Sequence, residues 1–188
     1  MKRVLTIAGS DSGGGAGIQG DLKALARCGV YAMTAVTAVT AQNTLGVAAV
    51  HQVPAAIVRA QIDAVLGDIG ADAIKIGMLG DAETVRTVAD RLAAVSVPIV
   101  LDPLLVASSG EELLAGDARE LLVELLVPLA AVVTPNLPEA RALAGAPDGD
   151  GESLARAVLA LGAGAVVLTG GHRGAPVDLF CDARSSVE

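Results

Sequence analysis

Aromatic residues are almost absent from this chain of 188 residues, which has one tyrosine, one phenylalanine and no tryptophan. Proteins that bind single-stranded nucleic acid stack bases on aromatic side chains, so this composition lacks their usual platform. Basic residues are also few, because 13 lysines and arginines stand against 21 acidic residues, a formal net charge of −8. Binding a phosphate backbone requires a basic face. We therefore expect no nucleic-acid partner.

The sequence also lacks an apolar run of the roughly 20 residues that a membrane span needs. The closest candidate, residues 121–133, is interrupted by Glu124 and Pro128. The apolar run that follows Lys2 and Arg3 is short and enters a glycine-rich turn, unlike a secretory signal peptide. These features predict a protein without a membrane partner.

Cysteine and histidine are scarce, and neither forms a recognisable site. Cys28 and Cys181 lie far apart without a CxxC pattern, so we predict buried thiols in a reducing cytoplasm. His51 and His172 have no partner at metal-ligand spacing, and no GxSxG elbow is present. Metalloenzyme and serine-hydrolase functions are therefore disfavoured.

Short apolar runs alternate with segments of helical periodicity along the whole chain. Strands are predicted at residues 4–8, 31–40, 73–76, 98–101, 131–133 and 165–168. Helices are predicted at residues 18–28, 54–66, 81–94, 117–126, 138–143 and 152–161. In the second helix, we expect Ile57, Ile62, Val65 and Leu66 to face inward.

The predicted strands are continuous apolar runs, which is typical of a parallel sheet covered by helices on both faces. The sequence therefore predicts an α/β fold in one domain. Ligands of such folds bind beyond the carboxyl ends of the strands. Most of the unusual residues fall at those ends: Gly9-Ser10-Asp11, Gln42-Asn43, Gly77-Met78, Asp102-Pro103, Pro135-Asn136 and Gly170-Gly171.

The glycine-rich segment 9–17 allows two interpretations. It can be a flexible turn, or its successive N–H groups can form a concavity that binds an anion at the start of a helix. Gly15, Gly17 and Gly20 formally match GxGxxG, but no acidic residue follows at the spacing of a dinucleotide site. Asp21 lies about one helical turn further on. It can be merely solvated, or it can turn toward the sheet edge and accept hydrogen bonds.

Asn136 and Glu139 are three residues apart and therefore share a helix face. One interpretation is a helix start with Asn136 as the cap and Glu139 near the positive end of the helix dipole. The other is an oxygen pair that holds magnesium, directly or through water. Asp102, at a strand end, has the same ambiguity. The spacing alone leaves these alternatives open.

Seven sequence blocks occur in a fixed order and together span essentially the whole chain. They are residues 6–23 (TIAGSDSGGGAGIQGDLK), 37–46 (TAVTAQNTLG), 75–79 (KIGML), 101–103 (LDP), 109–110 (SG), 134–139 (TPNLPE) and 170–172 (GGH). This series resembles the hydroxymethylpyrimidine/phosphomethylpyrimidine kinases, thiamine-pathway enzymes of the ribokinase-like superfamily. It is far more specific than a lone glycine pattern.

The resemblance implies a ribokinase-like three-layer fold with a mostly parallel sheet. It also implies ATP-dependent phosphorylation of the hydroxymethyl group of 4-amino-5-hydroxymethyl-2-methylpyrimidine, and then of its monophosphate. By position, the pyrimidine-binding residues would be Gly9, Asp21, Gln42 and Met78. The residues on the ATP and phosphate side would be Asp102, Asn136, Glu139, Thr169 and Gly171. Of these, Asn136 and Glu139 would hold Mg²⁺.

The chain departs from the family pattern in three places. Ser108 and Thr169 stand where the family often has lysine. Residues 1–188 would form one kinase domain that ends before the family's Gly-Thr-Gly-Cys motif, so the expected anion hole and catalytic base would lie beyond Glu188. Two alternatives follow: a pyridoxal-type kinase, or a pyrimidine-binding form impaired in catalysis. Relatives of this fold often dimerise, so a homodimer is a candidate assembly, and the expected location is cytoplasmic.

Overall fold

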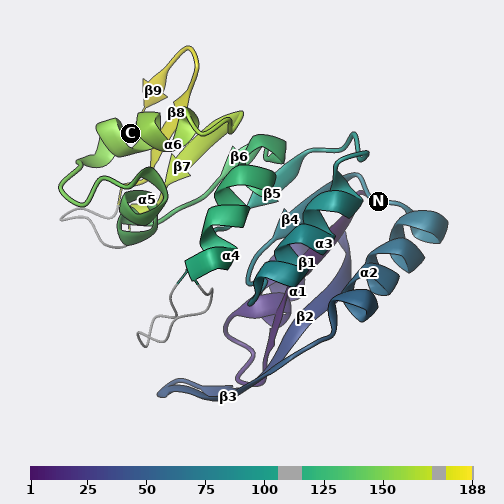
Figure 1. Ribbon diagram of the computed structural model, residues 1–188. Helices are drawn as coiled ribbons and strands as arrows, with labels where there is room; N and C mark the ends of the chain where they lie inside the picture. Colours follow the sequence, from purple (N-terminus) through teal and green to yellow (C-terminus); the bar gives the residue numbers. More distant parts are fainter. Residues whose placement is uncertain (106–115, 171–176, 188) are drawn as a thin grey trace.

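One sheet organises the part of the chain that the computed structural model describes, residues 1–105, 116–170 and 177–187 (Figure 1). Its strand order is β3-β2-β1-β4-β5-β6-β7-β8-β9. The parallel strands are β1 (Arg3–Asp11), β2 (Tyr31–Asn43), β4 (Ala73–Ile76), β5 (Ile99–Leu101), β6 (Val132–Val133) and β7 (Ala165–Leu168). All six predicted strands are therefore confirmed, and their parallel pairing agrees with the continuous apolar runs.

Three antiparallel strands, two at the sheet edges and one next to an edge, were not predicted from the sequence. They are β3 (Gly46–Gln52), β8 (Leu179–Asp182) and β9 (Ser186–Val187). Edge strands depend on pairing with a neighbour and carry a weaker hydrophobic signal than central strands. In β3, for example, residues 48–51 are all exposed.

The helices follow the predicted order. They are α1 (Gly17–Arg27), α2 (Ala55–Ala64), α3 (Ala82–Leu92), α4 (Gly116–Leu121), α5 (Leu137–Ala144) and α6 (Gly151–Leu159). Two of them continue into irregular turns: η1 (Val65–Ile69) after α2, and η2 (Leu122–Leu126) with η3 (Val127–Leu129) after α4.

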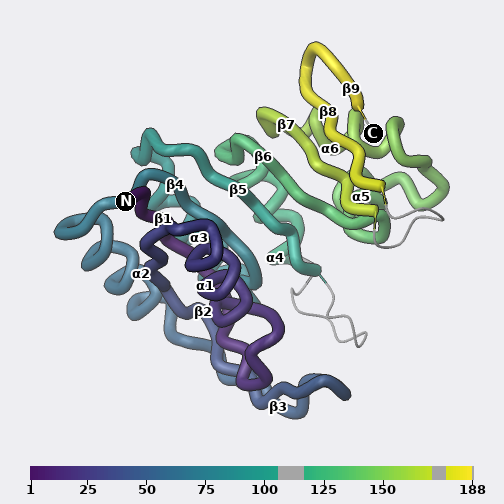
Figure 2. Tube along the Cα trace, turned by 180° about the vertical axis from the view of Figure 1, so that it is seen from behind, coloured from purple at the N-terminus to yellow at the C-terminus, as the bar shows by residue number. Residues whose placement is uncertain are grey.

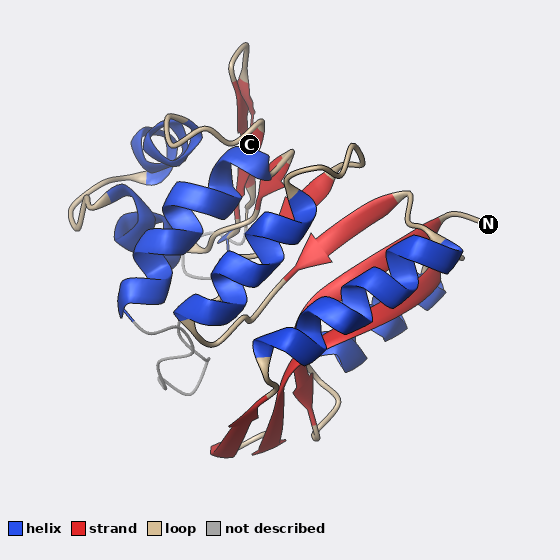
Figure 3. Cartoon of the chain, turned by 45° about the vertical axis from the view of Figure 1, so that its right-hand side comes forward, coloured by secondary structure: helices blue, strands red, loops and turns tan. Residues whose placement is uncertain are grey.

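The main core lies on one face of the sheet. Ile7, Ile76, Leu101 and Val133 are neighbours in the strand register, and all four are fully buried. They belong to one apolar cluster with side chains from α2, α3, α4, α5 and α6. Figure 3 shows helices packed side by side over the sheet. The parallel register thus builds a continuous apolar surface, which the helices cover.

The opposite face is covered unevenly. Among the described residues, α1 is the helix that packs there, against β1 and β2 (Figure 2). Further along the same face, Val100, Val132 and Val167 are only partly buried, and Phe180 is 38% exposed. Helices on both faces are confirmed, but the second layer is one helix in this part of the chain.

The prediction that Ile57 faces inward is wrong, because Ile57 is 53% exposed. Val58 and Ile62, four residues apart, are the fully buried pair of α2. Residues 57 and 62 differ by five positions, which separates them by about 140° around a helix of 3.6 residues per turn. The two isoleucines therefore cannot share the narrow buried face.

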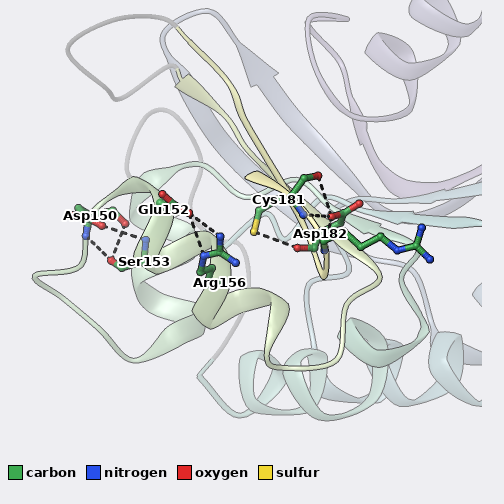
Figure 4. A network of polar contacts seen from close by, with 8 residues as sticks. Asp150, Glu152, Ser153, Arg156, Cys181 and Asp182 are labelled. Carbon is green, nitrogen blue, oxygen red and sulfur yellow. Dashed lines mark hydrogen bonds and ion pairs between the residues drawn. The ribbon is translucent and has the colours of Figure 1, made fainter. Parts of the chain in front are cut away.

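The last helix and the turn between the last two strands each contain their own local polar contacts (Figure 4). Asp150 caps α6 by accepting the N–H of Ser153, and Arg156 pairs with Glu152 one turn away. The carboxylate of Asp182 accepts the N–H groups of Arg184 and Ser185 in the turn between β8 and β9. These short-range bonds shape the turn that lets the chain reverse.

The prediction of two buried thiols is only half right. Cys181 is fully buried in β8, whereas Cys28 is exposed just after the last residue of α1. No helix within the described residues combines the length and the apolar character that crossing a membrane requires.

The two isoleucines of α2 provide a matched test of the packing. Ile62→Ala should lower the free energy of unfolding by about 3 kcal/mol, because it leaves a cavity beneath the sheet. Ile57→Ala should change it by less than about 0.5 kcal/mol, because its side chain is largely in water. Chemical denaturation of both variants measures the difference. Equal losses would contradict the assigned face of α2.

Candidate active site

Nearly all the predicted site residues lie at one edge of the sheet. Gly9 and Gln42 are near the ends of β1 and β2, while Met78, Asp102 and Thr169 follow β4, β5 and β7. Because these strands are parallel, their carboxyl ends meet at the same edge. Gly171 lies outside the described residues.

The glycine-rich segment between β1 and α1 forms the predicted concavity, but Asp11 already occupies it. Its carboxylate accepts the N–H groups of Gly13 at 2.8 Å, Gly15 at 2.9 Å and Ala16 at 2.8 Å. Burial alone would raise the pKa of Asp11, but these N–H donors together hold that pKa below its ordinary value. The segment is thus an ordered turn around an internal anion. The concavity predicted from the glycines binds this carboxylate.

Two glycines permit close approaches at the end of β1, one to α1 and one to Met78. Gly17 begins α1 with φ +53°, and a Cβ there would lie 2.3 Å from the carbonyl oxygen of Gly9. A Cβ on Gly9 would lie 3.2 Å from Sδ of Met78, which is 9% exposed. The structure therefore brings together Gly9 and Met78, two residues predicted for the pyrimidine side.

Asp21 turns from α1 toward the sheet, as one of the two sequence interpretations expected. Its carboxylate accepts a hydrogen bond from the hydroxyl of Thr6 in β1. Its second partner is a cation, because Nζ of Lys75 lies 2.9 Å from Asp21 Oδ1. Lys75 was not predicted as a site residue. The sequence feature that could have identified it is a lysine placed between two isoleucines in a short apolar strand.

Asp102 is the second carboxylate near this lysine. Its Oδ2 lies 3.5 Å from Nζ of Lys75. Burial raises the pKa of Asp102, the Lys75 ammonium opposes this shift, and the nearby Asp21 charge adds to it. The edge of the sheet thus places two carboxylates around one ammonium.

Asn136 and Glu139 form a reciprocal cap at the start of α5. The side chain of Asn136 accepts the Glu139 N–H at 2.9 Å, and the Glu139 carboxylate accepts the Asn136 N–H at 2.9 Å. This geometry satisfies the helix-cap interpretation. Thr169 lies beside this turn, because its N–H donates to the carbonyl of Pro135 and it bridges to Asn136.

Glu139 has an unusual environment for a capping residue, since it is only 5% exposed. Burial is the main cause that raises the pKa of Glu139 to about 7, and the Asp102 charge contributes. A nearby positive charge would stabilise the ionised form of a carboxyl group in this environment. Within the described residues, however, no group of three or more His, Cys, Asp or Glu side chains could alone hold a metal ion.

Gln42 belongs to the glycine-rich side of the edge. The hydroxyl of Ser12 donates to the Gln42 carbonyl and accepts the Gln42 N–H, at 2.7 and 2.8 Å. The hydroxyl of Thr40 donates to Gln42 Oε1 at 3.1 Å. These bonds join the end of β2 to the segment that Asp11 orders.

The raised pKa of Glu139 predicts that the stability of the protein falls as the pH rises. Its folded pKa lies above the ordinary value of 4.5, so folding favours the protonated carboxyl. The stabilising contribution is complete below pH 4.5 and declines as the pH rises to about 7. Glu139→Gln keeps a hydrogen-bond acceptor and removes this decline. The melting temperature of this variant relative to the native protein should rise by roughly 5 °C between pH 5 and pH 8.

Glu83→Gln removes the same charge from an exposed position of α3 and serves as the control. Thermal unfolding of the three proteins across this pH range provides the measurement. If the melting temperatures of the native protein and of Glu139→Gln change in parallel with pH, ionisation of the buried Glu139 carboxyl does not lower the stability, and the prediction is wrong.

Comparison with known proteins identifies the family of the chain. A family model described as phosphomethylpyrimidine kinase matches residues 11–188. A hydroxymethylpyrimidine/phosphomethylpyrimidine kinase of Rhizobium meliloti is 52% identical over 184 residues, which cover 95% of this chain and 69% of that protein. The protein of the same name from Haemophilus influenzae is 51% identical over 176 residues, which cover 92% of this chain and 65% of that protein.

Solved structures show the same relationship. Phosphomethylpyrimidine kinase from Clostridium difficile has a TM-score of 0.91 and 40% identity, covering 100% of this chain and 83% of that chain. An ADP complex of Bacillus subtilis pyridoxal kinase has a TM-score of 0.89 and 36% identity, covering 100% of this chain and 74% of that chain. The ribokinase-like fold expected from the resemblance is thus confirmed, and the chain belongs to the phosphomethylpyrimidine kinase family.

Proposed function

We propose that the protein containing this chain transfers the γ-phosphoryl group of ATP to the hydroxymethyl group of 4-amino-5-hydroxymethyl-2-methylpyrimidine, and then phosphorylates the monophosphate to the diphosphate. The observation that carries this proposal is the family match over residues 11–188, at 52% identity to a relative of that name. The product would serve thiamine biosynthesis. ATP is a cytoplasmic substrate, so the proposal includes a cytoplasmic location.

The pyrimidine would lie against Gly9, Asp21, Gln42 and Met78. The carboxylate of Asp21 can accept a hydrogen bond from the exocyclic amine, and the amide of Gln42 offers both a donor and an acceptor to the ring edge. The buried Met78 and the Gly9 backbone would provide an apolar wall for the flat ring. Their close approach supports this arrangement, since a Cβ on Gly9 would lie 3.2 Å from Sδ of Met78.

ATP and Mg²⁺ would lie on the side of Asp102, Asn136, Glu139, Thr169 and Gly171. The donor chemistry fits magnesium, which prefers carboxylate and amide oxygens and keeps several waters. Glu139 Oε2 and Asn136 Oδ1 already accept backbone N–H groups, which favours contact through water. Burial, with a contribution from the Asp102 charge, raises the pKa of Glu139, and a cation there would relieve the repulsion between the two carboxylates. Bound Mg²⁺ would neutralise phosphate charge during transfer.

A pyridoxal-type kinase is the second candidate. The similarity to the Bacillus subtilis pyridoxal kinase at a TM-score of 0.89 supports it. The Gly9, Asp21 and Gln42 set favours the aminopyrimidine, because it matches a ring edge that both donates and accepts hydrogen bonds.

A coupled ATP-consumption assay of the full-length protein tests the function. We expect turnover of the pyrimidine and of its monophosphate, with a kcat/KM at least roughly tenfold above that for pyridoxal, since one well-placed hydrogen bond is worth about this factor. Gln42→Ala should reduce this preference. A higher kcat/KM for pyridoxal would support the second candidate, and turnover of neither pyrimidine would refute the proposal.

We also propose that two copies associate through the β2–β3 hairpin. The hairpin projects from the body of the molecule, and Leu45 at its tip is 89% exposed (Figures 1 and 2). Light scattering should show an apparent mass that rises with protein concentration from that of one chain toward that of two. Leu45→Ser should shift this equilibrium toward the monomer. A constant monomer mass would contradict this assembly.

A further inference from the structure

Lys75 is placed where the sheet connects the two sides of the proposed site. It lies in β4, which pairs with β1 on one side and β5 on the other, and its register partners are Thr6 and Val100. Its chain neighbours Ile74 and Ile76 are buried in the main core. Because side chains alternate along a strand, Lys75 points to the other face, where α1 carries Asp21.

The ammonium group of Lys75 reaches both carboxylates at this edge. Nζ lies 2.9 Å from Oδ1 and 3.2 Å from Oδ2 of Asp21, and 3.5 Å from Oδ2 of Asp102. The side chains are 25%, 18% and 29% exposed for Lys75, Asp21 and Asp102. Partial burial strengthens these interactions relative to a pair fully in water.

Lys75 offsets part of the negative charge that Asp21 and Asp102 bring to this edge. The carboxylates of Asp21 and Asp102 are near enough for the Asp21 charge to raise the pKa of Asp102, and the Lys75 ammonium opposes this shift. The other two lysines are engaged elsewhere. Lys2 pairs with Asp72, beside the first residues of β1 and β4, and Lys23 donates to the carbonyl of Gly14.

The backbone leaves room for this ammonium. A Cβ on Gly77 would lie 3.3 Å from Nζ of Lys75 and 3.1 Å from Cβ of Ala8. Glycine at the end of β4 therefore allows the lysine side chain to extend along the sheet surface to the edge. This steric observation is independent of the charges.

We propose that Lys75 is a positioning residue whose ammonium group holds the carboxylates of Asp21 and Asp102 in a fixed relative arrangement, and so aligns the pyrimidine side with the phosphate side. The role of these two sides rests on the proposed function. Holding both groups in place matters because phosphoryl transfer depends mainly on positioning and charge neutralisation. Thr6 assists by donating its hydroxyl to Asp21.

Three variants of the full-length protein separate this role from simple stabilisation. Lys75→Met keeps the length of the side chain and removes its charge, whereas Lys75→Arg keeps the charge. Lys2→Met removes an equivalent charge at an exposed ion pair far from the site. Kinetics are measured at a temperature where thermal unfolding shows all the proteins to be folded.

We expect Lys75→Met to lower kcat by roughly 10- to 100-fold and to raise the KM for the pyrimidine by roughly tenfold, because Asp21 and Asp102 lose a shared charged partner. Lys75→Arg should recover much of both effects, and Lys2→Met should change neither. Unchanged constants in folded Lys75→Met would overturn the positioning role, as would an equal effect of Lys2→Met.

Two further measurements remain decisive if Lys75→Met folds poorly, and the second of them also remains decisive if the substrate assignment fails. Gly77→Ala retains the lysine but crowds its ammonium, and should reproduce part of the loss in kcat. Double-mutant cycles of the free energy of unfolding, combining the neutral Lys75→Gln with Asp21→Asn and with Asp102→Asn, need no substrate. Non-additive effects in both cycles support the shared contact, whereas additivity in both would overturn it. Turnover of neither pyrimidine would refute the proposed function. The double-mutant cycles would then decide whether Lys75 is shared by Asp21 and Asp102.

Discussion

Parallel pairing of β1 with β2 and β4, and of β4 with β5, is the constraint on which the site depends. It brings the carboxyl ends of strands that are distant in sequence to one edge, and it aligns alternate side chains into rows on each face. One row is apolar and makes the main core. The other contains Thr6 and Lys75, which hold Asp21. The core and the polar contacts of the site thus arise from the same register.

The chain has fewer cationic than acidic residues, and this imbalance matters at the edge of the sheet where the site lies. The chain has three lysines and an excess of acidic residues, yet Asp21, Asp102 and Glu139 lie at the edge of the sheet where we propose that the pyrimidine and ATP bind. Lys75 is the lysine whose ammonium contacts two of these carboxylates. Phosphates entering such a site would need a divalent cation and N–H donors. This requirement agrees with the proposal of Mg²⁺ near Glu139.

The glycine-rich segment shows how one motif can serve a different physical purpose from the one its composition suggests. Its N–H groups converge as an anion site would require, but the Asp11 carboxylate accepts three of them. The segment is a hydrogen-bonded turn, whereas a flexible turn was one expectation. These bonds position the start of α1, and therefore Asp21, relative to the sheet.

The sequence by itself determined the six parallel strands, their order with the helices, the set of residues at the strand ends and the family. These properties follow from apolar runs, local turn chemistry and ordered motifs, all of which are readable along the chain. Only the tertiary structure decided that Ile57 faces water, that Cys28 is exposed and that Asp11 occupies the concavity. It also decided that Lys75 joins Asp21 to Asp102. Lys75 and Asp21 are 54 residues apart, and their contact exists only because the sheet register and the packing of α1 bring them together.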